Sequence, residues 1–190
     1  MKQKIKEIIA DSITTKAHLL YDAKSLQAIE ECAKLASTTL KKGRKILICG
    51  NGGSAADSQH FAAELVGRFQ KERKAYSALA LSTDTSILTS LSNDYAFDKV
   101  FERQIEALGT RGDLLFAIST SGKAKNVLAA VKRAKKMGLK TIGLTGKDGG
   151  DLAKIADVAI IVSSDVTARI QESHILIIHI ICALVEDTLK

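Results

Sequence analysis

The sequence contains no proline and no tryptophan, and aromatic residues make up only 4% of its 190 residues. Proline-rich linkers and proline-rich recognition segments are therefore excluded. The shortage of aromatic rings also disfavours a platform for single-stranded nucleic acid, because such platforms stack bases on aromatic side chains. Three scattered cysteines (Cys32, Cys49 and Cys182) form no CxxC pair. They indicate buried free thiols in a reducing compartment rather than a disulfide framework or a cysteine-based zinc site.

Long hydrophobic runs are also absent. The longest covers residues 175–185 and is interrupted by His179, whereas a span of the bilayer needs roughly 18 to 20 residues. The N-terminal segment has no signal-peptide core. We therefore expect a cytoplasmic protein with no membrane partner.

Positive charge is in excess, with 28 Lys and Arg against 21 Asp and Glu and a net charge of +7. Basic residues cluster at 41–45, 71–74 and 132–136. No aromatic residue interleaves them, so they indicate a solvated face that attracts anionic metabolites and not a nucleic-acid site.

Apolar residues at helical spacing predict helix over residues 1–43, with Ile5, Ile8, Ile9 and Ile13 on one face. No sheet is evident for these helices to cover, and we expect them to pack on another subunit. After residue 43 the pattern changes, so we divide the chain into an N-terminal helical extension, 1–43, and an α/β unit, 44–190, which together form a single compact domain.

Short strands that are apolar throughout alternate with helices in the second unit. The strands are expected at 45–49, 78–81, 114–118, 141–144 and 158–162, and helices at about 54–69, 123–137 and 168–189. Such strands indicate a doubly wound α/β fold with a five-stranded parallel sheet covered on both faces. Ligands bind beyond the carboxyl ends of such strands, where the polar loops 51–54, 82–84, 119–122 and 145–150 are expected.

Two of these loops suit a ligand. The glycines of the loop 50–54 allow positive φ and close backbone approach, although its spacing fits neither a P-loop nor a dinucleotide fingerprint. A tight turn without a ligand also explains that loop. The hydroxyls of Ser119, Thr120 and Ser121 precede a helix, where free N–H groups and the helix dipole favour an anion such as phosphate. A hydroxyl-rich helix cap is the alternative.

Histidines and a glutamate supply candidate catalytic groups. His60 and Glu64 are four residues apart and share a helix face, although a surface ion pair has the same spacing. His179 lies within the apolar run, which favours a perturbed proton affinity; a core histidine bonded to a carbonyl is the alternative. His174 is five residues earlier, faces elsewhere and is interpreted as structural.

Taken together, the ordered motifs resemble the phosphoheptose isomerases within the sugar isomerase (SIS) fold. They are CGNGGSAADSQHFAAEL at 49–65, SND at 92–94, ISTSG at 118–122, LTGKDGG at 144–150 and TARIQE at 167–172, followed by His179. The resemblance extends from about residue 20 to the end of the chain. Ala124 departs from the family pattern, which usually has a phosphate-binding serine there; Lys123 or Lys125 could compensate.

The resemblance implies conversion of sedoheptulose 7-phosphate to D-glycero-D-manno-heptose 7-phosphate, the first step toward the activated heptose of bacterial surface polysaccharide such as lipopolysaccharide. It implies Glu64 and His179 as the acid–base pair and a Zn²⁺ ion in each subunit of a homotetramer, with active sites at subunit contacts. The implied substrate contacts are Asn51, Gly52, Gly53, Glu64, Asn93, Asp94, Ser119, Thr120, Ser121 and Gln171. The implied zinc ligands are His60, Glu64, Gln171 and His179.

One geometric question stays open. On a regular helix Gln171 and His179 would lie about 12 Å apart along the axis, near the limit for sharing one ion. Either the helix begins after Gln171, or the groups come from different chains; we favour an assembled, intersubunit site.

Two other functions remain as alternatives. One is a non-catalytic SIS protein of the kind that associates with a replication initiator, which lacks the catalytic pair. The other is an isomerase of a different phosphosugar.

Overall fold

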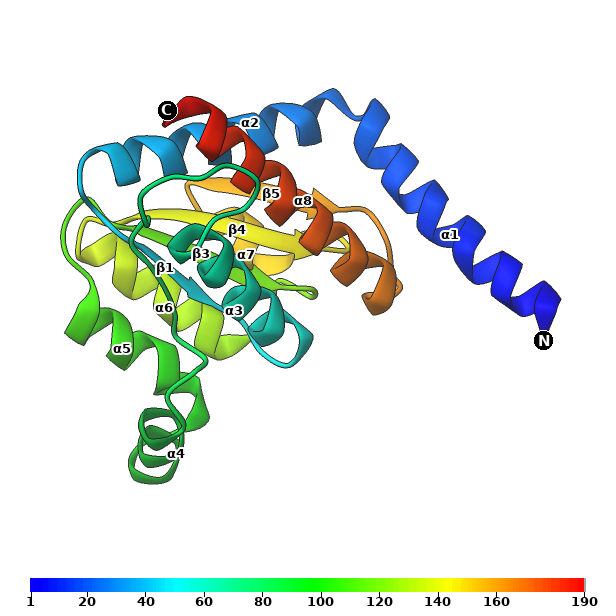
Figure 1. Cartoon of the computed structure of the whole chain (residues 1–190). Helices are drawn as coiled ribbons and strands as arrows, with labels where there is room; N and C mark the ends of the chain where they lie inside the picture. Colours follow the sequence, from blue (N-terminus) through cyan, green and yellow to red (C-terminus); the bar gives the residue numbers. More distant parts are fainter. Residues whose placement is uncertain (190) are drawn as a thin grey trace.

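The structure, a computed structural model, describes residues 1–189 and has helices on both faces of one sheet (Figure 1). The strands are β1 (Ile46–Cys49), β2 (Ala78–Ala80), β3 (Leu114–Ser119), β4 (Lys140–Gly146) and β5 (Val158–Val162). The helices are α1 (Lys2–Tyr21), α2 (Ala23–Lys41), α3 (Gly53–Val66), α4 (Thr85–Asp94), the short 3₁₀ helix η1 (Phe97–Lys99), α5 (Val100–Leu108), α6 (Lys125–Lys136), α7 (Gly150–Ile155) and α8 (Thr167–Thr188).

All strand pairs in the sheet are parallel, in the order β2-β1-β3-β4-β5. In the central register Ile46 faces Leu114 and Leu114 faces Lys140. Every residue of β1 and β3 is buried, which explains why these strands are apolar without alternation. The predicted doubly wound, five-stranded fold is confirmed, and the strand order is the flavodoxin-like one.

Two hydrophobic clusters flank the sheet. One, beneath α2, α3 and α8, includes Phe61, Phe116 and Ile178; the other, beneath α5, α6 and α7, includes Phe101, Val131 and Leu152. Because α3 and α8 lie side by side on one face, side chains from these two helices can meet.

The second N-terminal helix packs on the sheet of its own chain, contrary to the expectation that no sheet is available to it. Asp22 ends α1 and caps α2 by accepting bonds from the N–H groups of Lys24 and Ser25. Helix α2 then buries Ile29, Cys32 and other small residues in the sheet core of its own chain. For α2 the expectation that no sheet awaits it is therefore wrong, whereas packing of its remaining surface on another subunit stays a prediction.

Helix α1, in contrast, extends past the body of the molecule (Figure 1). Its residues Ile5, Ile8, Ile9 and Ile13 are 45–63% exposed, and its apolar face is not covered by the rest of the chain that the structure describes. Helix α8 is long and apolar enough to cross a membrane by length and composition alone, but half of its apolar window is buried within the fold, as in a core helix.

Candidate functional site

Three side chains from the neighbouring helices α3 and α8 converge on one point. His60 and Glu64 lie one turn apart on α3, and His60 Nε2 is 3.1 Å from a carboxylate oxygen of Glu64. His179 comes from α8, and its Nε2 lies 3.0 Å from Nε2 of His60. One ligand atom from each residue lies within 4.8 Å of the others. The predicted grouping of these three residues is thus present within a single chain.

The three donors have the chemistry and spacing of a metal site. A tetrahedral zinc ion bound at about 2.0–2.1 Å holds its ligand atoms roughly 3.4 Å apart, close to the 3.0 and 3.1 Å that separate His60 Nε2 from the other two donors. Two imidazole nitrogens and a carboxylate oxygen are also donors that zinc accepts without cysteine. The residues therefore fit a bound zinc ion.

The two histidines of α8 lie in different environments. His179 is partly exposed, and its ring faces those of His60 and Phe69, with centroids 5.1 and 5.4 Å away. His174 is fully buried and its Nε2 bonds the carbonyl of Thr145 at 3.1 Å. Burial lowers the pKa of His174 to about 4, against the opposing effect of that bond. The expectation of an apolar setting for His179 is wrong, whereas the structural interpretation of His174 agrees with its burial.

The glycine loop 50–52 leads from β1 into α3. Gly52 has φ of +55°, which lets the chain turn sharply before the helix. The side-chain amides of Asn51 and Asn126 exchange two hydrogen bonds, both 2.9 Å long. Asn126 is 2% exposed and lies in the first turn of α6. This reciprocal amide pair ties the glycine loop to the loop that follows β3.

The loop 119–122 follows β3 and precedes α6. Gly122 has φ of +63°, and a Cβ there would lie 2.1 Å from the carbonyl oxygen of Gly149, so no larger residue fits. Ser119 is buried at the strand end, whereas Thr120 and Ser121 are partly exposed. The three hydroxyls predicted to bind phosphate therefore lie in one tight turn at the carboxyl end of the sheet.

Helix α6 begins without a side-chain cap. Its N-cap is Ala124, which forms no capping bond, so N–H groups of the first turn remain available for an anion. Exposed Lys123 and Lys125 flank this end. The missing serine hydroxyl thus leaves a helix terminus that still carries partial positive charge.

Gln171 lies against the start of α3, because a Cβ on Gly53 would come 2.2 Å from its Nε2. Helix α8 begins at Thr167 and contains both Gln171 and His179. The alternative in which the helix begins after Gln171 is therefore wrong. A role for Gln171 as a zinc ligand stays a prediction, as does the intersubunit site that would reconcile it with the helix length.

Asn93 and Asp94 end helix α4, which packs against α5 and η1. Both side chains are exposed, and the Asn93 amide donates to the Asp94 carboxylate at 2.9 Å. Figure 1 shows α4 at the far end of the molecule from α8. Their predicted contact with substrate stays a prediction.

Sequence reasoning missed a buried ion pair behind the site. Glu186 of α8 accepts bonds from the N–H groups of Phe69, Gln70 and Lys71 and from Arg73 Nε at 2.9 Å. Burial would raise the pKa of Glu186, but these donors outweigh it and the pKa lies below its usual value. The pair fixes Phe69 against His179. Only the presence of a glutamate at the end of the apolar run in the C-terminal helix could have signalled it.

Asp57, one turn before His60, was also missed. Its Oδ2 is buried and has no hydrogen-bond partner among the described residues. Burial raises its pKa to about 6, with the nearby His60 opposing the shift.

Comparison with known proteins identifies the family. A family model described as a SIS domain matches residues 6–146. A phosphoheptose isomerase of Aliarcobacter butzleri is 55% identical over 86% of this chain and 87% of that one. The phosphoheptose isomerase of Sulfurimonas denitrificans is 51% identical over 98% and 95% of the two chains. The chain belongs to the phosphoheptose isomerase family.

Solved structures of the family have the same fold. The phosphoheptose isomerase GmhA of Neisseria gonorrhoeae superposes with a TM-score of 0.92 at 44% identity, covering 98% of each chain. A phosphoheptose isomerase from Francisella tularensis gives a TM-score of 0.93 at 37% identity, covering 97% of each chain. The predicted resemblance to this family of aldose–ketose isomerases is confirmed.

Proposed function

We propose that this protein isomerises sedoheptulose 7-phosphate to D-glycero-D-manno-heptose 7-phosphate through an enediol, the first step toward activated heptose for bacterial surface polysaccharide. The observation that carries the proposal is the convergence of His60, Glu64 and His179 from two helices in a chain of this family. An aldose–ketose isomerase needs a base and an acid–base group at adjacent atoms of one sugar. A carboxylate and two imidazoles at hydrogen-bond distance supply them.

The phosphate end of the substrate is proposed to bind at Ser119, Thr120 and Ser121. Their hydroxyls and the uncapped first turn of α6 offer donors at a point of partial positive charge. At the other end, the glycine loop with Asn51, Gly52 and Gly53 would contact the sugar, together with Gln171 beside Gly53. Asn93 and Asp94 are proposed as contacts from another subunit, since α4 packs away from α8 in its own chain.

Two groups carry the protons of the reaction. Glu64 takes a proton from C1 of the ketose and later returns it to C2. His179 gives a proton to the C2 oxygen as the enediol forms and accepts one from the C1 oxygen as it collapses. No atom is gained or lost, so the sugar leaves as an isomer. A carboxylate and an imidazole suit these tasks near neutral pH.

A zinc ion in each subunit is part of the proposal, held by His60, Glu64 and His179, with Gln171 as the further ligand implied by the family pattern. When bound, zinc would orient the sugar oxygens and stabilise the negative charge that develops on them.

We also infer a homotetramer in the cytoplasm. The apolar face of α1 supports an assembly, because contiguous exposed apolar patches are rare on monomeric proteins. The three cysteines are buried free thiols, which suits a reducing compartment.

The decisive experiment incubates the purified protein with sedoheptulose 7-phosphate and follows the product by NMR. The proposal predicts a new aldose phosphate at equilibrium with the ketose. An unchanged substrate spectrum from folded, zinc-loaded protein would favour the non-catalytic SIS binding protein. Turnover of only a different ketose phosphate would favour the other isomerase.

A further inference from the structure

A basic pocket lies at the end of the sheet where the strands begin, opposite the carboxyl ends that carry the proposed active site. Its cavity of about 510 Å³ sits where β1, β3 and β4 begin, between the end of α2 and the loops before β3 and β4. Four cations line it: Lys42, Arg44, Arg111 and Lys140. We propose that this pocket binds a small molecule carrying several phosphate groups.

The four cations lack counter-charges. Among the residues that the structure describes, none of them forms an ion pair or a side-chain hydrogen bond. The neighbouring carboxylate, Asp113, is already satisfied by Lys45 Nζ at 2.6 Å and by the backbone N–H groups of Lys45 and Thr110. The pocket therefore keeps its positive charge, which an anion with several charges would neutralise.

Backbone hydrogen bonds fix the chain segments that carry these cations. The N–H of Arg44 donates to Thr39, that of Gly112 to Gly138, and that of Lys140 to Asp113. These bonds join α2 to β1 and the loop before β3 to β4. A ligand entering the pocket would therefore meet charges whose backbone positions are already fixed.

Two glycines lie beside the stems of the arginine side chains. Gly112 and Gly138 have φ of +91° and +78°, and a Cβ on them would lie 3.5 Å from Arg44 Nε and 3.2 Å from Arg111 Cγ. Each arginine stem thus lies against bare backbone at the cavity wall. Guanidinium groups bind phosphate oxygens in a bidentate fashion, and Thr38 lines the same cavity.

The dipole of α2 offers a partner to only one of the four cations. Lys42 caps the C-terminus of α2, where a cation offsets the partial negative charge of the last carbonyls. Arg44 and Arg111 lie in loops and Lys140 begins a strand, so they have no such partner. An anionic ligand explains all four.

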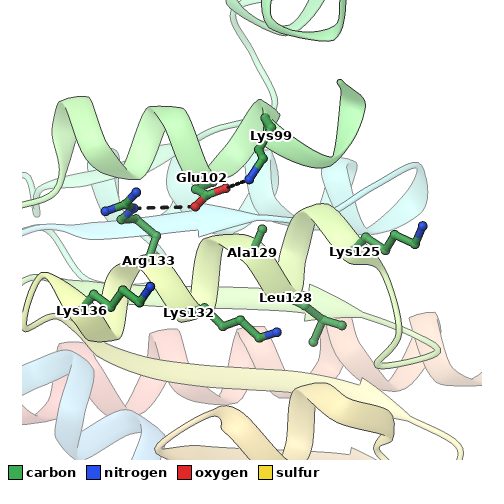
Figure 2. A pocket seen from close by; sticks show the side chains of 8 residues that line it. All are labelled: Lys99, Glu102, Lys125, Leu128, Ala129, Lys132, Arg133 and Lys136. Atoms are coloured by element: carbon green, nitrogen blue, oxygen red, sulfur yellow. Dashed lines mark hydrogen bonds and ion pairs between the residues drawn. The ribbon is translucent and has the colours of Figure 1, made fainter. Parts of the chain in front are cut away.

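Another basic pocket on α5 and α6 provides a matched control. It contains Lys132, Arg133 and Lys136, but Glu102 lies in its centre and pairs with Lys99 and Arg133 (Figure 2). Lys132 and Lys136 form no ion pair among the described residues. Replacing Lys132 and Lys136 removes two positive charges, as many as replacing Arg44 and Arg111 does. It does so, however, in a pocket that already contains a carboxylate.

The test titrates inorganic triphosphate into three full-length proteins by calorimetry: the wild type, Arg44→Gln/Arg111→Gln and Lys132→Gln/Lys136→Gln. Binding at the loop 119–122 is common to all three and cancels in the comparison. We expect the arginine variant to bind at least about tenfold more weakly, because two charge-assisted contacts with the phosphate oxygens would be lost. The lysine variant should change by less than about twofold, as expected for a screened surface charge.

Equal weakening in both variants would show a general charge effect and overturn the proposal, as would wild-type affinity in the arginine variant. Triphosphate binding that is unaffected while a single-stranded oligonucleotide binds through the arginines would overturn it in favour of nucleic acid. Thermal unfolding checks that each variant folds. If the arginine variant does not fold, Lys42→Gln/Lys140→Gln replaces it with the same expected loss.

Discussion

At the scale of single residues, the chemistry depends on how closely His60, Glu64 and His179 approach one another. Two neutral imidazole nitrogens 3.0 Å apart share one proton as donor and acceptor, or both direct lone pairs at a metal. A carboxylate 3.1 Å away completes either arrangement. Small changes in these three side chains should therefore affect turnover far more than stability.

Glu64→Gln should leave the fold and the phosphate loop intact but lower kcat by about 10²–10⁴-fold, since the proposed proton acceptor is lost. Product NMR with sedoheptulose 7-phosphate measures the change. Glu72→Gln, at a glutamate whose side chain is 91% exposed, is the control and should retain full activity. Normal turnover by Glu64→Gln would remove Glu64 from the mechanism.

His60→Ala and His179→Ala should each lower the bound zinc well below one ion per chain, because each removes a ligand from a site with few others. Elemental analysis of protein purified in zinc-containing buffer measures the content. His18→Ala, at an exposed histidine of α1, should retain the wild-type content. Equal zinc in all four proteins would place the metal elsewhere.

At the scale of elements, the sequence predicted the five strands because each contains a short apolar run between polar loops, and β1 and β3 are buried along their whole length. It predicted no helix over α4, which is short and has no fully buried residue. It also suggested that His179 is buried, whereas the structure leaves this side chain partly exposed. Five residues rotate a helix position by about 140°, and on a helix that is apolar on most sides the sequence does not tell which face meets the sheet.

The candidate site was predictable where residues share a motif and not where distant segments meet. His60 and Glu64 follow from their spacing. The joining of Asn51 to Asn126, or of Glu186 to the segment after α3, depends on tertiary packing across 75 residues or more, which no local pattern records.

Glu186→Gln tests that tertiary connection. It would leave Arg73, whose side chain is 10% exposed, without its counter-charge and should lower the free energy of unfolding by about 3 kcal/mol. Because the folded pKa of Glu186 is below 4.5, its ionised form stabilises the fold fully above that value. The difference between wild type and variant should therefore shrink as the pH falls through the folded pKa.

Urea denaturation at several pH values measures this difference. Glu30→Gln, which breaks an exposed pair with Lys34 on α2, should change stability by less than about 1 kcal/mol. A Glu186→Gln difference that is absent at neutral pH, or that grows on acidification, would contradict the assigned role.

At the scale of the whole molecule, the apolar face of α1 is exposed to solvent in a single chain. Ile9→Asp/Ile13→Asp should dissociate the proposed tetramer, since charges would face a buried contact. Light scattering after size exclusion measures the mass, and the turnover assay reports whether the site needs the assembly. Lys6→Asp, at an exposed residue of the same helix, is the control. A fully active monomer would refute the intersubunit site.

The reciprocal amide pair of Asn51 and Asn126 has a consequence for selectivity in the proposed reaction. It fastens the loop that would face the sugar to the helix that would hold the phosphate, so the span between them is set before any ligand arrives. The distance between the sugar-binding loop and the phosphate-binding helix therefore selects the length of sugar phosphate that the enzyme accepts. A sugar phosphate one carbon shorter could reach only one end of that span at a time.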